Sequence, residues 1–423
     1  MVVFTRLKSF YRSITNSIAF YPMLYAFAAI VAGMSMNLLE DSTVTDWIRK
    51  QAPQLLVNDV ETARGLVTTL VAGAISMLVF SFSMVMLLLS QAASNYSPRV
   101  LPSLVSERRH QRVLGIFLAT ILYNAIIMIS IDPNGKDYQL PGFSVLMGTL
   151  LSIISLGMFV YFIHSISSSI QINNIMDNIH TLSRKRIQYL TEIQVSDYEL
   201  PDSSKWDTYS VEHSGTLQNI SHNALKEYAL ENDLKFDILI PKGKHVLAST
   251  DLYRCSGRLD KDAQATVLKN FKFIESELVG DNYLLGFKQL TEIGIKAMSP
   301  GVNDPGTAID SIHFLTDLFA MRMMKHDGEV IVDDNHNVII NSRAITFQEL
   351  IYTVLASYRN YSKQDFTVMF TLLEMTNNLM EAQSVNQGYY DSILQQSELL
   401  IEDARKHIDN SHDLQLLEDL HEK

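Results

Sequence analysis

The chain has little that would suit a disulfide-stabilised or nucleic-acid-binding protein. Its 423 residues include one cysteine, Cys255, which excludes an intramolecular disulfide and a cysteine-rich metal site. The formal net charge is −12, and the excess of acidic residues lies after residue 112. Because binding to phosphates needs a basic surface, we expect no nucleic-acid partner.

Enzyme signatures are also missing. The sequence contains no Walker loop, no G-x-G-x-x-G, no H-E-x-x-H and no G-x-S-x-G. The histidines do not fall at metal-ligand spacings, and the acidic stretch 333–337 has the composition of a turn. We therefore expect no catalytic residues, no metal site and no cofactor.

Charge is absent from four long apolar runs, residues 17–39, 66–90, 113–131 and 143–163. Each run reaches about the 20 residues that a helix needs to cross a bilayer. The first run has no clean small-x-small cleavage site at its end, which favours a retained span over a signal peptide. The pattern predicts a four-helix transmembrane domain over residues 17–165.

The basic residues alternate with these runs. Arginine and lysine are concentrated before the first run, between the second and third, and after the fourth, while the other two loops are acidic or mixed. By the positive-inside rule, both termini and everything after residue 163 should be cytoplasmic, which in a bacterium-like cell means the inner membrane. The basic, apolar segment 1–16 is a candidate interfacial helix, or else a basic flank that only orients the first span. Without a charge inside any span, a proton-driven transporter is disfavoured.

The second run carries a hydroxyl group every seven residues. Seven residues are nearly two helical turns, so these side chains share one face of the helix. Such a face commonly packs closely against neighbouring helices, and it can also line a narrow wet pathway in an oligomer. Asn124, in the third run, is the most polar side chain inside a span and is expected to form an interhelical hydrogen bond. The candidate pore-lining residues are Thr69, Ser76, Ser83, Ser90 and Asn124.

Four arginines lie near the inner end of the second span and the start of the third. In a symmetric pore they would ring the inner mouth and favour anions. Alternatively, they only orient the spans, as expected for any inner loop. They are Arg99, Arg108, Arg109 and Arg112.

The polar part of the chain, residues 166–423, divides into three regions according to its sequence patterns. A helical linker is predicted over 166–206, and short apolar stretches separated by turns predict a small β-barrel-like module over 207–260. Residues 261–423 have helical periodicity at 284–297, 307–324, 347–358, 365–380 and 387–408, with a polar hairpin near 333–337. The fold class is thus a membrane α-helical protein with a cytoplasmic α+β domain.

Two further features stand out in this half. One is a junction between helices, where Asp304 can cap a helix that begins with Pro305, although Asn303 and Asp304 could also hold a cation or a partner's backbone. The junction residues are Ser299, Pro300, Gly301, Asn303, Asp304 and Pro305. The other is an apolar seam that predicts subunit contacts, formed by Ile393, Leu400, Ala404 and Ile408.

Three strings resemble one known family: SQAASNYSPRVL at 90–101, QRVLGIF at 111–117 and AMSPGVNDPGTA at 297–308. The chain resembles, over nearly its whole length, the predicted bacterial membrane proteins grouped as domain of unknown function 2254. The resemblance implies an inner-membrane location and a four-span layout. It implies no activity, so it assigns no functional residue.

Together these patterns predict a homo-oligomeric ion channel or passive pore whose cytoplasmic domain forms a vestibule or gate. Its partners would be the lipid bilayer, further copies of the chain and small ions. The alternative is a membrane-anchored sensor or scaffold whose spans only anchor and oligomerise the cytoplasmic domain.

Overall fold

The computed structural model describes residues 20–40, 45, 47, 50–57, 59–95, 108–131, 142–169, 171–194, 198–273, 282–333 and 335–423. The chain divides into two compact units, Met1–Gln171 and Ile172–Lys423, which we call the first and second units. The predicted interfacial segment 1–16 lies outside the described residues, and so does Arg99.

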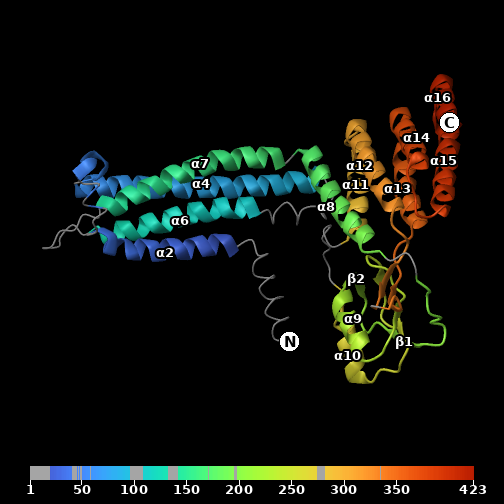
Figure 1. Cartoon of the computed structure of the whole chain (residues 1–423). Helices are drawn as coiled ribbons and strands as arrows, with labels where there is room; N and C mark the ends of the chain where they lie inside the picture. Colours follow the sequence, from blue (N-terminus) through green and yellow to red (C-terminus); the bar gives the residue numbers. More distant parts are fainter. Residues whose placement is uncertain are drawn as a thin grey trace. The chain divides into compact units, whose positions relative to one another are not determined.

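The first unit is a bundle of long helices (Figure 1). Helix α6 contacts all three of the others, and α4 and α7 also contact each other. Two buried clusters hold the bundle together, one around Val67, Tyr123 and Ile127 and the other around Phe117 and Phe162. The helices are α2 (Phe20–Glu40), α4 (Val60–Asn95), α6 (Arg108–Ser130) and α7 (Gly142–Ser169), with a short 3-10 turn η1 (Pro53–Leu55) before α4.

Three of these helices are long and apolar enough to cross a membrane. They are Val60–Leu88, Arg109–Ser130 and Gly142–Ser167, within the residues that the structure describes. In α2 the described apolar stretch, Phe20–Met36, is shorter. The expectation of four spans is therefore confirmed for three helices, and the first span is not confirmed.

In the second unit, α8 (Ile172–Glu192) packs against a hairpin of two helices, α11 (Tyr283–Ala297) and α12 (Pro305–Met323). The C-terminal helices are α13 (Phe347–Ser362), α14 (Phe366–Glu381), α15 (Gly388–His407) and α16 (Ser411–His421). Side chains cap several of them: Thr346 and Glu349 form a reciprocal capping box at the start of α13. These helices match the predicted periodic segments closely.

The strands of the second unit form two sheets. The first is mixed, with the order β1-β5-β3-β8-β7, and the second has the order β4-β2-β6. Strands β3 and β8 pair in parallel, with Phe236 opposite Ile340. The strands are β1 (Asp207–Ser210), β2 (Gly215–Ile220), β3 (Phe236–Ile238), β4 (His245–Val246), β5 (Asp251–Cys255), β6 (Phe271–Phe273), β7 (Glu329–Val332) and β8 (Val338–Ser342).

This topology does not confirm the barrel-like module predicted over 207–260. The strands β6, β7 and β8 come from later in the chain and join those of the predicted module. Helices α9 (His222–Glu231) and α10 (Lys261–Leu268) lie near the same sheets. The physical reason is that β3 needs partners on both edges, and its second partner is more than a hundred residues away in sequence.

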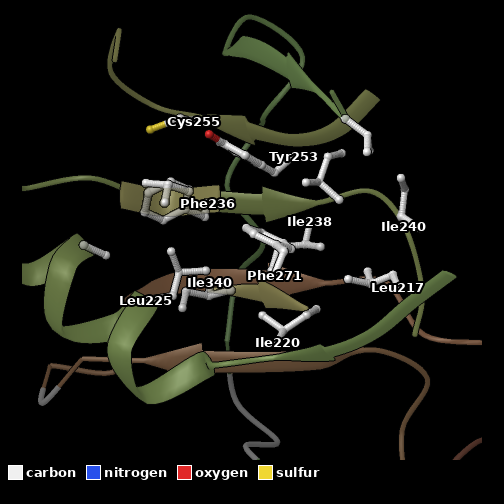
Figure 2. Close-up of a cluster of buried hydrophobic side chains, with 14 of the residues drawn as sticks. Leu217, Ile220, Leu225, Phe236, Ile238, Ile240, Tyr253, Cys255, Phe271 and Ile340 are labelled. Atoms are coloured by element: carbon white, nitrogen blue, oxygen red, sulfur yellow. The ribbon is translucent and has the colours of Figure 1, made fainter. Parts of the chain in front are cut away.

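An apolar core fills the space around these sheets (Figure 2). Tyr253 lies at its centre, with its ring stacked between those of Tyr209 and Phe271 at centroid distances of 5.1 and 5.5 Å. Cys255 is buried in the same core. Leu252 of β5 is also buried in this core, so β5 is covered on both faces near its middle and does not show a simple two-residue alternation.

The predicted subunit seam is wrong. Ile393, Leu400 and Ala404 on α15 are completely buried within their own chain, and Ile408 is 9% exposed. Helix α15 contacts α13, α14 and α16, which cover this face. An amphipathic pattern shows that a face is buried, but it does not show whether the same chain or another copy buries it.

Candidate functional site

The seven-residue hydroxyl stripe lies on the outside of the first unit. Thr69, Ser76, Ser83 and Ser90 are all exposed. The fully buried positions of α4 are Ala63, Val67, Ala74 and Ser81. At 3.6 residues per turn, the two sets fall on roughly opposite faces of the helix. Packing among the described residues therefore does not account for the stripe.

The stripe is polar but partly satisfied by its own helix. Thr69 Oγ1 donates to the carbonyl of Gly65 at 2.8 Å, and Ser76 Oγ donates to the carbonyl of Ala72 at 2.9 Å. Gly73 is exposed beside them, and a side chain there would meet nothing within 4 Å. Phe80 and Leu87, each one helical turn after a serine of the stripe, are 47% and 58% exposed, so this face combines hydroxyls with large apolar side chains. It suits either helix contact or a narrow wet path with apolar constrictions.

Asn124 lies elsewhere, inside the bundle between α6 and α7. Its Nδ2 donates to the carbonyl of Thr120 at 2.9 Å, within the same helix, while its buried Oδ1 has no hydrogen-bond partner. One turn away, the hydroxyls of Thr120 and Ser155 lie 2.7 Å apart and join the two helices. The structure therefore does not bring Asn124 together with the stripe on α4.

Of the four candidate arginines, the side chains of two are described. Arg109 and Arg112 are exposed in the first turns of α6. The Arg112 guanidinium lies over the ring of Tyr21 on α2, 5.6 Å from its centroid. Arg99 lies outside the described residues, as does the side chain of Arg108.

The junction motif forms the turn between α11 and α12. Asp304 caps α12: its Oδ1 accepts from the Thr307 amide at 3.2 Å, and its Oδ2 accepts from Thr307 Oγ1 at 2.6 Å. Pro305 is the first helical residue, and Asn303 has a positive φ of 49°. The Ser299 hydroxyl donates to the carbonyl of Lys296, and Gly301 is exposed with no neighbour that a Cβ would meet. Every described contact of Asp304 serves the capping of a helix.

A cluster of charged side chains, which the sequence did not reveal, joins β7, the segment after β3 and the start of α9. Glu329 on β7 accepts from Lys242 Nζ at 3.0 Å, and His222 Nδ1 lies 3.5 Å away. All three side chains are less than one-fifth exposed. Burial works to raise the pKa of Glu329, but Lys242 and His222 outweigh it and hold that pKa at about 2.

A second pair lies next to it. Arg322 at the end of α12 is completely buried, with Nη1 2.6 Å from the carbonyl of Lys325 and Nη2 bonded to Asp327. Lys325 Nζ donates to the carbonyls of His326 and Gly328, each at 2.9 Å. Burial, followed by the charge of Arg322, lowers the pKa of Lys325 to about 8. The described part of this region is therefore rich in buried positive charge.

The described residues contain no group of three or more metal-ligating side chains. What they do contain is a set of apolar helices of membrane-spanning length and a separate α+β unit with buried charges. These features define a membrane protein with several apolar helices. The family model described as "Predicted membrane protein (DUF2254)" matches residues 15–378, and the chain belongs to this family, as its three sequence strings suggested.

Curated relatives extend over much of the chain. The chain is 26% identical over 329 residues to uncharacterized protein MT1328 of Mycobacterium tuberculosis, strain CDC 1551 / Oshkosh. It has the same identity to uncharacterized protein Mb1321c of Mycobacterium bovis and uncharacterized protein Rv1290c of Mycobacterium tuberculosis, strain H37Rv. Each match covers 74% of this chain and 63% of the relative, so the chain spans less than two-thirds of their length. No solved structure matches the chain.

Proposed function

We propose that the chain forms a homo-oligomeric ion channel or passive pore in the inner membrane, with the second unit as a cytoplasmic vestibule or gate. In this proposal α2 is a fourth span, and both termini are cytoplasmic. The protein has no catalytic role, and its partners are the bilayer, other copies of the chain and small ions.

The observation that supports the proposal is the outward position of the hydroxyl stripe. Thr69, Ser76 and Ser83 turn away from the other helices of their own chain. In hydrocarbon, a row of hydroxyls and small residues gains nothing over leucine or valine, whereas in an assembly it allows close approach or contact with water. A ring of α4 helices around a central axis would use this face.

Charge supports an anion preference for the same assembly. Arg109 and Arg112 are exposed at the start of α6, and the spans themselves carry no charge. Positive side chains at one mouth of a pore raise the local concentration of anions. Their position on the cytoplasmic side follows from the positive-inside rule.

The test is ion flux through the purified protein in liposomes, with chloride and potassium gradients imposed separately. Ser83→Leu should reduce the flux at least several-fold because leucine narrows and dries the path. Phe82→Leu is the matched control: Phe82, the residue before Ser83 on α4, is 56% exposed but points about a quarter-turn away from the stripe. Equal flux in the parent and Ser83→Leu, with both correctly folded, would exclude a path along this face.

A second candidate function is the membrane-anchored sensor or scaffold, whose spans only hold and oligomerise the second unit. The cluster of buried charges around Glu329 favours it, because such clusters often mark ligand sites. Absence of flux under either gradient, together with ligand-dependent stabilisation of the full chain, would favour the sensor over the pore.

A further inference from the structure

A small cavity lies in the second unit beside the charge cluster. Its volume is about 20 Å³, which is room for one water-sized particle. It is bounded by α8, by the first residues of α11, and by segments that follow β3 and β8. Its charged lining residues are Arg186, Lys242, Glu329 and Arg343.

Positive charge exceeds negative charge around this cavity. Among its described lining residues, Glu329 is the sole carboxylate, and its nearest cation is Lys242. Arg186 and Arg343 form no ion pair with any described residue. The Nε of Arg186 is buried without a hydrogen-bond partner, while its guanidinium carbon lies 5.4 Å from the ring centroid of Tyr189. A buried donor that lacks a partner is unfavourable unless a further group satisfies it.

Burial is the largest cause of the lowered pKa values of the basic groups around the cavity, and neighbouring positive charge adds to it. Burial, then the charge of Lys242, lowers the pKa of His222 to about 4, so this side chain stays neutral near pH 7. The pKa of Lys325 is lowered to about 8 by burial and by Arg322. Protonation of His222 or Lys325 is thus disfavoured, even though the carboxylates of Glu329 and Asp327 lie nearby.

The start of α11 adds to this field. This helix has 15 residues and is capped by Asn282, whose Oδ1 accepts from the Leu284 amide at 3.2 Å. Asn282, Tyr283 and Leu284 all line the cavity. The first turn of a helix carries partial positive charge and favours a negative ion nearby.

We propose that this cavity binds one monovalent inorganic anion of about the size of chloride, held between Arg186, Arg343 and the start of α11. The small inner volume favours a particle close to water in size over a larger oxyanion such as phosphate. The site is a property of the second unit alone, so it does not depend on the protein being a pore.

The experiment measures thermal unfolding of the purified full chain in detergent. Trp206 is one of two tryptophans, so its fluorescence in a Trp47→Phe background follows the second unit. Sodium gluconate is replaced stepwise by sodium chloride or sodium bromide at constant ionic strength. Binding to the folded state raises the midpoint with ion concentration, which gives an apparent Kd.

The decisive variants are Arg186→Gln and Arg343→Gln. Each removes one charge-assisted donor, which should weaken chloride binding about tenfold or more. Arg184→Gln is the matched control: Arg184 lies two residues away on α8, and its side chain is 57% exposed and 3.9 Å from Asp317. It should bind chloride as the parent does. Since Arg343 is exposed, its variant keeps the test valid if Arg186→Gln does not fold.

Three results would overturn the proposal. One is an unfolding midpoint that does not change when chloride replaces gluconate. Another is an equal chloride response in the parent, Arg186→Gln and Arg343→Gln, which would show a general salt effect. The third is stabilisation by inorganic phosphate without stabilisation by chloride, which would contradict the size argument.

Discussion

Gly148 on α7 lies directly against the side chain of Asn124 on α6, and a Cβ on residue 148 would overlap the amide oxygen. Since Asn124 is completely buried, its side chain cannot move out into solvent to make room for the Cβ. Gly148→Ala should destabilise the first unit by roughly 1–3 kcal/mol, the usual effect of overpacking. The measurement is the thermal midpoint of the detergent-solubilised chain.

The same helix offers a control for this substitution. A Cβ on Gly157 would meet nothing within 4 Å, so Gly157→Ala should be neutral or stabilising by up to about 1 kcal/mol, since alanine favours helix. Replacing Asn124 with alanine in the Gly148→Ala background should recover part of the loss. Identical midpoints for Gly148→Ala and Gly157→Ala would disprove the close contact.

His222 should make the second unit less stable in mild acid. Burial and Lys242 lower its pKa from 6.5 to about 4, so between these values the unfolded chain binds the proton more tightly than the folded chain. Stability therefore falls as pH decreases from about 6.5 to 4. Below this, Glu329, whose pKa is lowered to about 2, extends the loss from about pH 4.5 to 2.

The variant His222→Gln separates the two contributions. It should remove the loss between pH 6.5 and 4, which amounts to roughly 2–3 kcal/mol, and leave the loss at lower pH. Urea unfolding followed by Trp206 fluorescence in the Trp47→Phe background, at a series of pH values, measures the difference. If parent and variant curves run parallel from pH 7 to 4, His222 does not titrate in this way.

Asp304 should stabilise the start of α12. Its carboxylate accepts hydrogen bonds from both the amide and the hydroxyl of Thr307, so Asp304→Ala should lower stability by about 1 kcal/mol. Asp304→Asn should retain most of the cap, because asparagine is an equally good N-cap residue. A larger loss for Asp304→Asn than for Asp304→Ala, measured by urea unfolding, would contradict a capping role.

Ser311 and Tyr358 link three helices by a chain of hydrogen bonds. Tyr358 Oη donates to Ser311 Oγ at 3.0 Å, and Ser311 Oγ donates to the carbonyl of Leu290 at 2.7 Å. Ser311→Ala removes the acceptor of the buried Tyr358 hydroxyl and should cost about 1–3 kcal/mol, whereas Tyr358→Phe should cost about 1 kcal/mol. A double-mutant cycle that gives no coupling between the two sites would rule out this link.

Much of the second unit's helical structure was predictable. The segment 284–297 corresponds to α11 (Tyr283–Ala297), and 387–408 corresponds to α15 (Gly388–His407). Helix α15 buries one face, which imposes an apolar period close to 3.6 on the sequence, whereas α11 is buried around most of its circumference and Lys288 is its one exposed residue. Their ends carry local signals, so the boundaries agree within one or two residues.

The partners of these elements were not predictable in the same way. Periodicity identifies one face of a helix, but it does not identify what covers that face. The apolar seam on α15 is covered by helices of its own chain, whereas the hydroxyl stripe on α4 is exposed. Arg186, Lys242 and Glu329 lie far apart in sequence and in different types of element, so no local spacing indicated that they share a cavity.

The pairing of β3 with β8 determines how this unit can be divided. Phe236 of β3 pairs with Ile340 of β8 far along the chain, and α10, β6, α11 and α12 are among the elements between the two strands. A fragment that ended near residue 260 would leave one edge of β3 unpaired, a condition that promotes aggregation. Such non-local pairing also slows folding, so β3 and β5 must wait for β8 before their sheet is complete. During synthesis at the membrane, the early strands would therefore need protection until residue 342 has left the ribosome.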